Sequence, residues 1–424
     1  MFILIWLLCA VPLFAQPAPA KVQVAEITLI GNQLTRPWVI ERELRFDVED
    51  SVTAADLEAA RLRLLSLGLF NNVRVDHDNE GVITVQVSEQ FRFIPILGAS
   101  PMEGSLNDAL REPDRIMDII VFTAGFADIN FRGHGAALGV LTEFGARSGV
   151  NLEYQTRWLS PRRPLAVSVG VRSLDLSDRH ASVLGFDRRL KQRRAFIDVA
   201  TRRGAPSRLG LNLRYDHVSE SAERPATGDT HQALWFAPYA ILDRRNLEWY
   251  PTHGLFARAD LESAFGTTTF LRSRATLATY APLTDGSRPL LIAARCYGGT
   301  AQSNTPPWAR YYFGFADNFR GYSSVKSEAA NYLSGELEVR FPVTREITYD
   351  VPLVGRYGQD IPFWIGGAVF AERAHTQLDG ARTDLFAYGA ALHVRFPYVQ
   401  VFEVSYARNL DNESEVVFAT GVRF

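Results

Sequence analysis

From about residue 91 to the end of the chain, apolar and polar residues alternate along short segments. In residues 207–216, Leu209, Leu211 and Leu213 fall on one face of an extended strand, and charged or polar side chains fall on the other. Residues 254–263 repeat this pattern. Strands of soluble sheets are usually about five or six residues long. Segments of about ten residues with one densely charged face are typical of a barrel that contacts lipid outside and water inside.

The length of this region predicts a large closed sheet. A membrane-spanning strand of about 9–11 residues takes roughly 20 residues with its connection, which gives about 16 strands. The pattern places them near 91–98, 118–129, 134–145, 149–158, 165–173, 191–201, 207–216, 231–242, 254–263, 270–281, 288–299, 331–342, 361–371, 383–395, 398–408 and 414–424. The interval from 300 to 330 is then an external loop. Because open strand edges are unstable in lipid, the first and last strands must pair to close the barrel.

Residues 21–90 predict a separate α+β domain. Residues 22–30 alternate as a strand that stops at a Gly-Asn turn. Two helical patterns follow, and the second opens at Thr53 and ends at Gly68. Two more strands, near 72–77 and 82–87, flank a hairpin turn. The expected order is strand, helix, helix, strand, strand.

The first 20 residues have the character of a signal peptide. A nearly unbroken apolar run ends at Phe14 and is followed by small residues and prolines. About 13 apolar residues are too few for a spanning helix, and no later window reaches the roughly 18 that one needs. Cys9 lies in this leader, so its removal leaves Cys296 as the single thiol and allows no intrachain disulfide.

Composition adds few chemical candidates. The chain has 45 Lys and Arg against 47 Asp and Glu, and this near-neutral balance argues against a nucleic-acid partner. Its 8 His residues show no metal-type spacing. The sequence contains neither a nucleophile elbow nor a P-loop. We therefore expect no enzyme activity, no cofactor and no metal site.

Four segments carry motifs of a known family. These are Gly-Leu-Phe at 68–70 leading into Val-Arg-Val at 73–75, the Gly-rich turn at 130–135, the turn at 243–254 and the aromatic C-terminus at Phe424. They resemble the superfamily of outer-membrane proteins typified by BamA, TamA and the two-partner-secretion transporters, in which POTRA domains precede a sixteen-stranded barrel. The resemblance implies a mainly β fold: a signal peptide at 1–20, one β-α-α-β-β POTRA domain at 21–90 and a transmembrane β-barrel at 91–424.

The most specific motif is Phe319-Arg320-Gly321-Tyr322, which lies in the loop between the eleventh and twelfth expected strands. The family has an Arg-Gly-aromatic tip in this loop, folded back into the lumen, and this implies a lumen latch. Glycine permits the backbone bend, and the tyrosine can pack on the wall. A guanidinium inside a barrel needs a carboxylate, because an unpaired buried charge is costly.

Alternation along residues 331–342 points both Glu336 and Glu338 to the lumen. Glu338 matches the family's partner for the arginine and is the first choice. Glu336 is expected to be an ordinary lumen residue, and it is a secondary latch candidate together with Phe319. The family often has Asp where Ile365 stands, so the usual second carboxylate is missing and the latch is weaker or differently connected.

The resemblance implies insertion or translocation of β-rich polypeptides in the bacterial outer membrane, with the POTRA domain in the periplasm. A client strand would add to the POTRA edge at Asn72, Val73 and Val75 by strand augmentation. It would then reach a lateral seam between the first and last strands, whose residues are Phe91, Phe93, Phe418, Gly421 and Phe424. The expected partners are outer-membrane or secreted β-rich clients, the lipid bilayer and periplasmic accessory proteins.

Two other functions remain open at this point. A single POTRA domain fits a dedicated secretion channel, or a periplasmic scaffold for one partner. Lumen charges such as Arg258, Asp260 and Glu262 would suit a passive porin, although the POTRA domain argues against it. Depletion of the chain distinguishes these functions: a generalist loses many barrels, a dedicated transporter loses one secreted protein, and a porin changes only solute uptake.

Overall fold

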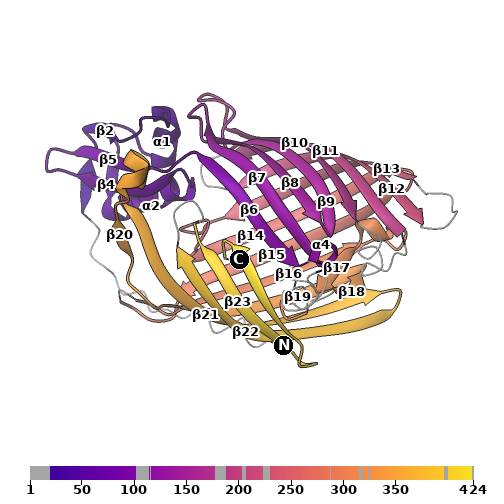
Figure 1. The fold of residues 1–424 in the computed structure, drawn as a ribbon. Coiled ribbons are helices and arrows are strands. Elements are labelled where there is room, and N and C mark those ends of the chain that lie inside the picture. Colours follow the sequence, from indigo (N-terminus) through magenta and orange to yellow (C-terminus); the bar gives the residue numbers. More distant parts are fainter. Residues whose placement is uncertain are drawn as a thin grey trace.

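The computed structural model describes residues 20–101, 114, 116–176, 188–202, 207–222, 230–286, 288–314, 319–322, 325–395 and 400–422. A small α+β domain lies at one end of a large barrel (Figure 1). The expected signal peptide, apart from Ala20, and the expected seam residue Phe424 lie outside the described residues. Within those residues, no helix is long and apolar enough to cross a bilayer.

The N-terminal domain has the expected strand and helix order. Its elements are β1 (Lys21–Gln23), β2 (Glu26–Ile30), α1 (Pro37–Leu44), β3 (Ser51–Thr53), α2 (Ala54–Ser66), β4 (Phe70–His77) and β5 (Val82–Glu89). Thr53 and Asp56 form a capping box that starts α2. β5 is the central strand of a three-stranded sheet, parallel to β2 and antiparallel to β4. β2 and β4 are therefore the two sheet edges. The short pair of β1 and β3 was not expected.

The expected barrel is confirmed. Its sixteen long strands in the described residues are β6 (Phe93–Pro101), β7 (Ile120–Phe131), β8 (Ala136–Gly145), β9 (Arg147–Thr156), β10 (Leu165–Leu176), β11 (Arg188–Arg202), β12 (Arg208–Ala222), β13 (Thr230–Asp243), β14 (Gly254–Gly266), β15 (Phe270–Pro282), β16 (Leu291–Ala301), β19 (Asn331–Pro342), β21 (Ile361–Leu378), β22 (Ala381–Arg395), β23 (Phe402–Asn409) and β24 (Ser414–Thr420). Neighbouring strands follow one another around a closed barrel in which β24 lies next to β6.

Short elements fill the connections. These are α4 (Ile116–Ile119), the 3-10 helices η3 (Pro307–Ala309) and η4 (Pro352–Gly358), a hairpin of β17 (Tyr311–Gly314) and β18 (Val325–Ala329), and β20 (Ile347–Tyr349), which pairs with β21. The hairpin of β17 and β18 lies in the loop expected between 300 and 330. Its sequence alternates too briefly to distinguish it from irregular loop, which explains why no strands were expected there.

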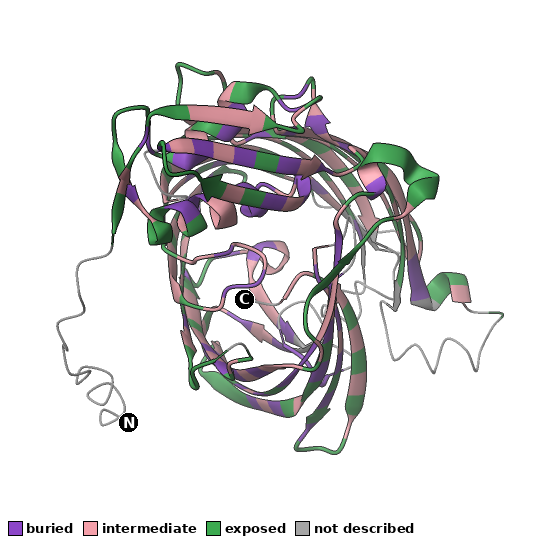
Figure 2. Ribbon diagram, turned by 90° about the vertical axis from the view of Figure 1, so that its left-hand side faces the viewer, coloured by how far each residue is buried: buried purple, intermediate pink, exposed green. Residues whose placement is uncertain are grey.

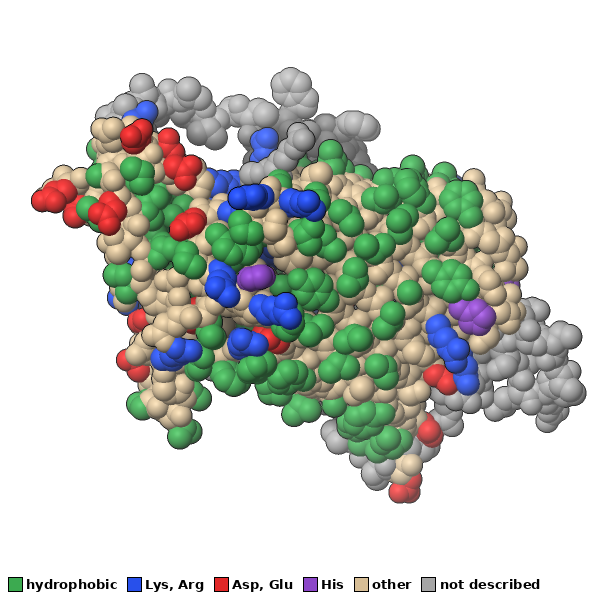
Figure 3. All heavy atoms as spheres, turned by 90° about the horizontal axis from the view of Figure 1, so that it is seen from above, with side chains coloured by type: hydrophobic (Ala, Val, Ile, Leu, Met, Phe, Trp, Pro, Cys, Tyr) green, Lys and Arg blue, Asp and Glu red, His purple; other side chains and the backbone are tan. Residues whose placement is uncertain are grey.

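Burial alternates along the barrel strands as the sequence predicts (Figure 2). On β19, Leu333 and Leu337 are 50% and 46% exposed, whereas Glu336 and Glu338 are 5% and 1% exposed. Leucines therefore face outward and glutamates inward. The outer face carries many apolar side chains, and its Lys and Arg side chains lie mainly toward the N-terminal domain (Figure 3). This is the arrangement that a lipid-facing barrel requires.

The N-terminal domain is docked on one side of the barrel mouth (Figure 2). The Arg36 backbone N–H donates to the carbonyl of Gly133 at 2.9 Å. Arg202 of β11 lies 3.4 Å from Glu43 of α1, and both side chains are 3% exposed. Barrel residues Leu247, Tyr250, Leu291 and Val401 belong to the same hydrophobic cluster as the core of the domain. The two parts therefore share one core.

Candidate functional site

The tip of the 300–330 loop is buried inside the barrel. Phe319 and Arg320 are 0% exposed and Tyr322 is 3% exposed. Gly321 has φ of 85°, in the left-handed region that favours glycine. A Cβ at this position would lie 2.9 Å from the Cβ of Ala387 on β22. The glycine therefore provides the bend that the motif predicts, and it also allows a close approach to β22.

The guanidinium of Arg320 contacts three carboxylates from three different strands. Its Nη2 donates to Glu336 of β19 at 3.0 Å, and its Nη1 donates to Glu403 of β23 at 3.3 Å. Its Nε and backbone N–H both donate to Glu372 of β21. The guanidinium carbon lies 3.4 Å from the centre of the Phe370 ring. One side chain thus links β19, β21 and β23.

These contacts fix the charge state of the tip. Burial alone lowers the pKa of the Arg320 guanidinium, but Glu372, Glu336, Glu338 and Glu403 together raise it above its ordinary value. Charge-assisted hydrogen bonds are stronger than neutral ones. Removal of one partner from a buried ion pair leaves an uncompensated charge. We call these contacts of Arg320 with Glu336, Glu372 and Glu403 inside the barrel the Arg320 latch.

The prediction that Glu338 is the direct partner of Arg320 is wrong. Glu338 Oε2 accepts hydrogen bonds from Arg340 at 3.0 and 3.2 Å, and Glu336 makes the contact with Arg320 instead. Glu336 lies directly opposite Glu372 in the register of β19 and β21, and the tip sits at that level. Two residues along a strand shift a side chain by about 6.6 Å. The lumen-facing orientation of both glutamates is as expected.

The carboxylate that Ile365 lacks is supplied elsewhere. Glu372 lies further along the same strand, β21, and Glu403 lies on β23. Both contact Arg320 directly. The contacts of Arg320 therefore come from positions 372 and 403 and do not need a carboxylate at position 365. The sequence signal for this was alternation, since both residues are acidic and fall on the inward face of their strands.

Further contacts hold the tip to the last strands. The Gly321 N–H donates to Glu415 of β24 at 2.9 Å, and Asn409 of β23 donates to the Gly321 carbonyl at 2.9 Å. The Tyr322 hydroxyl donates to the carbonyl of Phe386 on β22 at 3.3 Å. Sequence reasoning missed these partners, because a polar side chain near a strand end, or a backbone carbonyl, gives no signal of where a distant loop will fold.

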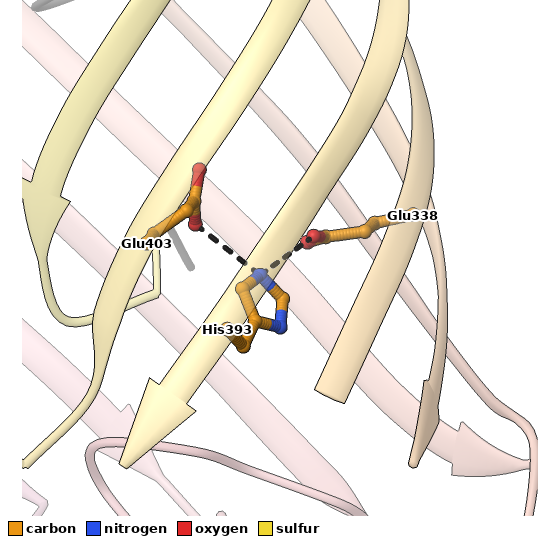
Figure 4. A group of neighbouring side chains, drawn as sticks. All are labelled: Glu338, His393 and Glu403. Carbon is orange, nitrogen blue, oxygen red and sulfur yellow. Dashed lines mark ion pairs between the residues drawn. The ribbon is translucent and has the colours of Figure 1, made fainter. Parts of the chain in front are cut away.

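A second cluster adjoins the latch (Figure 4). His393 Nε2 lies 3.7 Å from Glu338 Oε1 and 3.5 Å from Glu403 Oε2. The three residues come from β22, β19 and β23, and all are buried. Three residues on separate strands have no fixed spacing, so the search for metal-type spacing could not find them. Glutamate and histidine side chains are able to bind a metal ion.

The expected seam residues that the structure describes lie near the start of β6 and near the end of β24. The Phe91 ring contacts the rings of Phe93 and Tyr357, with centroids 5.9 and 5.5 Å away. Phe418 is 54% exposed on β24. Gly421 has φ of 86° and follows directly after β24. Their role in a seam stays a prediction.

The expected client edge lies on β4, which is an edge strand. Asn72 is half-buried, Val73 is 1% exposed and points into the domain core, and Val75 is half-buried. Part of this edge has a neighbour: Arg74 Nη2 lies 3.1 Å from Asp360, which follows η4. Client binding there stays a prediction.

Comparisons with known proteins support the fold. The Omp85 superfamily domain matches residues 130–424, and the POTRA family, described as surface antigen variable number repeat, matches residues 22–90. No curated protein matches the chain.

Three solved structures are similar. BamA from Haemophilus ducreyi lacking POTRA domains 1–3 has a TM-score of 0.55 and 14% identity, over 94% of this chain and 83% of that one. CdiB from Acinetobacter baumannii has a TM-score of 0.56 and 12% identity, over 94% and 73%. CdiB from Escherichia coli has a TM-score of 0.53 and 9% identity, over 97% and 90%. At these identities the likeness concerns the fold.

Proposed function

The chain belongs to the Omp85 superfamily, and we propose that it captures β-rich client polypeptides at the β4 edge and passes them to a lateral seam between β24 and β6. Omp85 barrels sit in the bacterial outer membrane with their POTRA domains in the periplasm, and they are non-enzymatic. The chain is accordingly an outer-membrane protein transporter or insertase.

The observation that carries the proposal is the junction of β24 and β6. Seven consecutive residue pairs join β23 to β24, and nine join β6 to β7. β24 is the neighbour of β6 in the closed barrel, and with 7 residues it is the shortest of the sixteen barrel strands in the described residues. A strand this short can form only a few backbone hydrogen bonds with β6, so we propose this junction as the place where the barrel opens.

The residues that follow β24 support the proposed opening between β24 and β6. After Thr420 the chain turns at Gly421, whose N–H donates to the carbonyl of Val401 at 2.6 Å. Val422 then packs against the hydrophobic cluster that contains Val401 and the domain core. Residues 421 and 422 are thus held against the hydrophobic cluster. An exposed strand edge at this place could template an incoming strand.

The β4 edge would deliver the client. β4 is an outer strand of its sheet, and a sheet edge offers unpaired backbone groups to an extended peptide. The domain is docked at the barrel mouth through Glu43 and Arg202, so a strand bound there starts close to the barrel. The client's own folding would supply the energy, because hydrogen bonds formed with the barrel edge satisfy its backbone in lipid.

A reversible cross-link across the seam tests the proposal. In a Cys296→Ser background, Phe93→Cys with Thr420→Cys joins the start of β6 to the end of β24 through a short, reducible, thiol-reactive cross-linker. Phe402→Cys with Thr420→Cys is the matched control, because residues 402 and 420 already pair between β23 and β24. The measurement is insertion of outer-membrane barrel proteins whose abundance falls when the chain is depleted.

We expect the 93–420 link to stop insertion and reduction of the link to restore it, whereas the 402–420 link leaves insertion intact. Unimpaired insertion through the 93–420 link would rule out the seam. If depletion removes one secreted protein and no barrel, the chain is a dedicated secretion channel, and its lumen rather than its seam carries the client.

A further inference from the structure

We propose that Glu338, His393 and Glu403 bind one divalent transition-metal ion of the Zn²⁺ class beneath the Arg320 latch. The proposal concerns a binding site and does not depend on how clients are handled. Each residue faces the lumen from a different strand, and the three side chains point toward one another (Figure 4). The exposed fractions are 1% for Glu338, 0% for His393 and 2% for Glu403.

Two buried atoms of the cluster lack a hydrogen bond to any described residue, and this points to a ligand. Within the described part of the chain, Glu338 Oε1 and His393 Nε2 have no hydrogen-bond partner. A buried polar atom without a hydrogen-bond partner destabilises the folded protein. His393 Nε2 lies 3.7 Å from one carboxylate and 3.5 Å from the other. Both distances exceed the range of about 2.7–3.2 Å for an N–H···O hydrogen bond, so a proton on Nε2 satisfies neither oxygen well.

The same distances fit metal ligands. Zn²⁺ binds histidine nitrogen and carboxylate oxygen at about 2.0–2.2 Å, which places two tetrahedral ligand atoms about 3.3–3.6 Å apart. The observed 3.5 and 3.7 Å are close to this spacing. All three ligand atoms lie within 4.8 Å of one another. Small side-chain movements would therefore bring them around a single ion.

Neighbouring groups hold each ligand in place. Arg340 donates to Glu338 Oε2 at 3.0 Å, which leaves Oε1 directed at the histidine. Arg320 donates to Glu403 Oε1 at 3.3 Å, which leaves Oε2 directed the same way. The Tyr250 hydroxyl lies 3.4 Å from His393 Nδ1. A proton on Nδ1, the nitrogen that faces Tyr250, leaves the Nε2 lone pair for the metal, and metal-binding histidines are usually oriented by a partner at their other ring nitrogen.

The bound ion would reinforce the latch. It would join β19, β22 and β23, whereas Arg320 joins β19, β21 and β23 through Glu336, Glu372 and Glu403. Glu403 belongs to both sets, so the metal and the loop tip would hold the same carboxylate from two sides. A ligand that binds only the folded state stabilises it. Metal binding should therefore raise the stability of the barrel.

The experiment uses the full-length protein in detergent, stripped with a chelator and then titrated with Zn²⁺ alone. We expect one equivalent of tightly bound Zn²⁺ and a higher thermal midpoint. His393→Gln should lose the bound equivalent and the shift in midpoint. His375→Gln is the matched control, because His375 is 53% exposed at the far end of β21 and lies outside the cluster. It should bind Zn²⁺ as the unchanged protein does.

X-ray absorption of the Zn²⁺-loaded, unchanged protein makes the test independent of how a variant folds. One imidazole with oxygen ligands is the expected coordination. Sulfur coordination, which would implicate Cys296, would overturn the proposal, and so would a shell without imidazole. Absence of bound Zn²⁺ in the unchanged protein, or retention of the equivalent in folded His393→Gln, would overturn it as well.

Discussion

Arg320 connects three strands inside the barrel. Arg320 is fully buried and contacts Glu336, Glu372 and Glu403. Its planar guanidinium presents several donors in fixed directions, which a lysine ammonium does not. The motif around Arg320 predicted a charged loop tip in the lumen, but the choice between Glu336 and Glu338 depends on the level at which the tip sits along β19. Alternation gives the face of a strand and not that level, so the sequence could not settle the partner.

Arg320→Ala should destabilise the protein by roughly 3–5 kcal/mol, because three buried carboxylates lose their common partner. Arg320→Lys should recover only part of this loss. The measurement is the urea midpoint of the folded barrel in detergent. Arg310→Ala is the control in the same loop: Arg310 pairs with Glu328, both side chains are about one-fifth exposed, and its loss should cost less than about 1 kcal/mol. Equal midpoints for Arg320→Ala and Arg310→Ala would contradict the latch.

At the scale of elements, the barrel strands follow from alternation, whereas their ends and the short elements do not. β19 spans the expected residues 331–342. β21 extends to Leu378, well beyond the expected end at 371, because the membrane limits the apolar face of a strand but not its paired length. The β17–β18 hairpin and η4 depend on contacts with distant strands and leave no periodic signal. The three strands of the metal cluster likewise become neighbours only when the sheet closes.

The loop tip offers a prediction at this scale. Gly321→Ala should destabilise the protein by about 1–3 kcal/mol, since alanine is strained at φ of 85° and its Cβ would crowd Ala387. Gly321→Ala with Ala387→Gly should recover the steric part of the loss. Gly335→Ala is the matched control, because its added Cβ meets nothing within 4 Å. Chemical labelling of a cysteine placed at Tyr322 would report the tip, and identical labelling in all three variants would refute the close fit.

At the scale of the whole molecule, the POTRA domain and the barrel act as one folded unit. Glu43 of α1 and Arg202 of β11 form a buried pair, and the Arg36 N–H bonds to Gly133 across the same interface. Docking of this kind was not visible in the sequence, because Glu43 and Arg202 are separated by many residues and neither belongs to a motif. It places the β4 edge beside the barrel mouth.

Glu43→Gln should weaken this docking, because Arg202 remains buried without its counter-charge. The Arg36 amide reports the interface directly, and its hydrogen-exchange protection should fall at least tenfold, which corresponds to about 1.4 kcal/mol. Glu58→Gln changes an exposed glutamate that pairs with Arg61 within α2 and should leave the Arg36 amide unchanged. Equal protection in both variants would show that the pair does not secure the domain.

The contact between Gly321 and Glu415 makes the wall of the barrel mechanically uneven. The loop tip braces β19, β21 and β23, and through Glu415 it also holds β24. A barrel wall that is held by contacts on one side moves most easily where those contacts end. We therefore expect β24 to stay with the strands that the loop tip contacts, while β6 moves away. An arriving polypeptide would then meet a stationary edge at β24 and a receding edge at β6, and the stationary edge can set the register of its pairing.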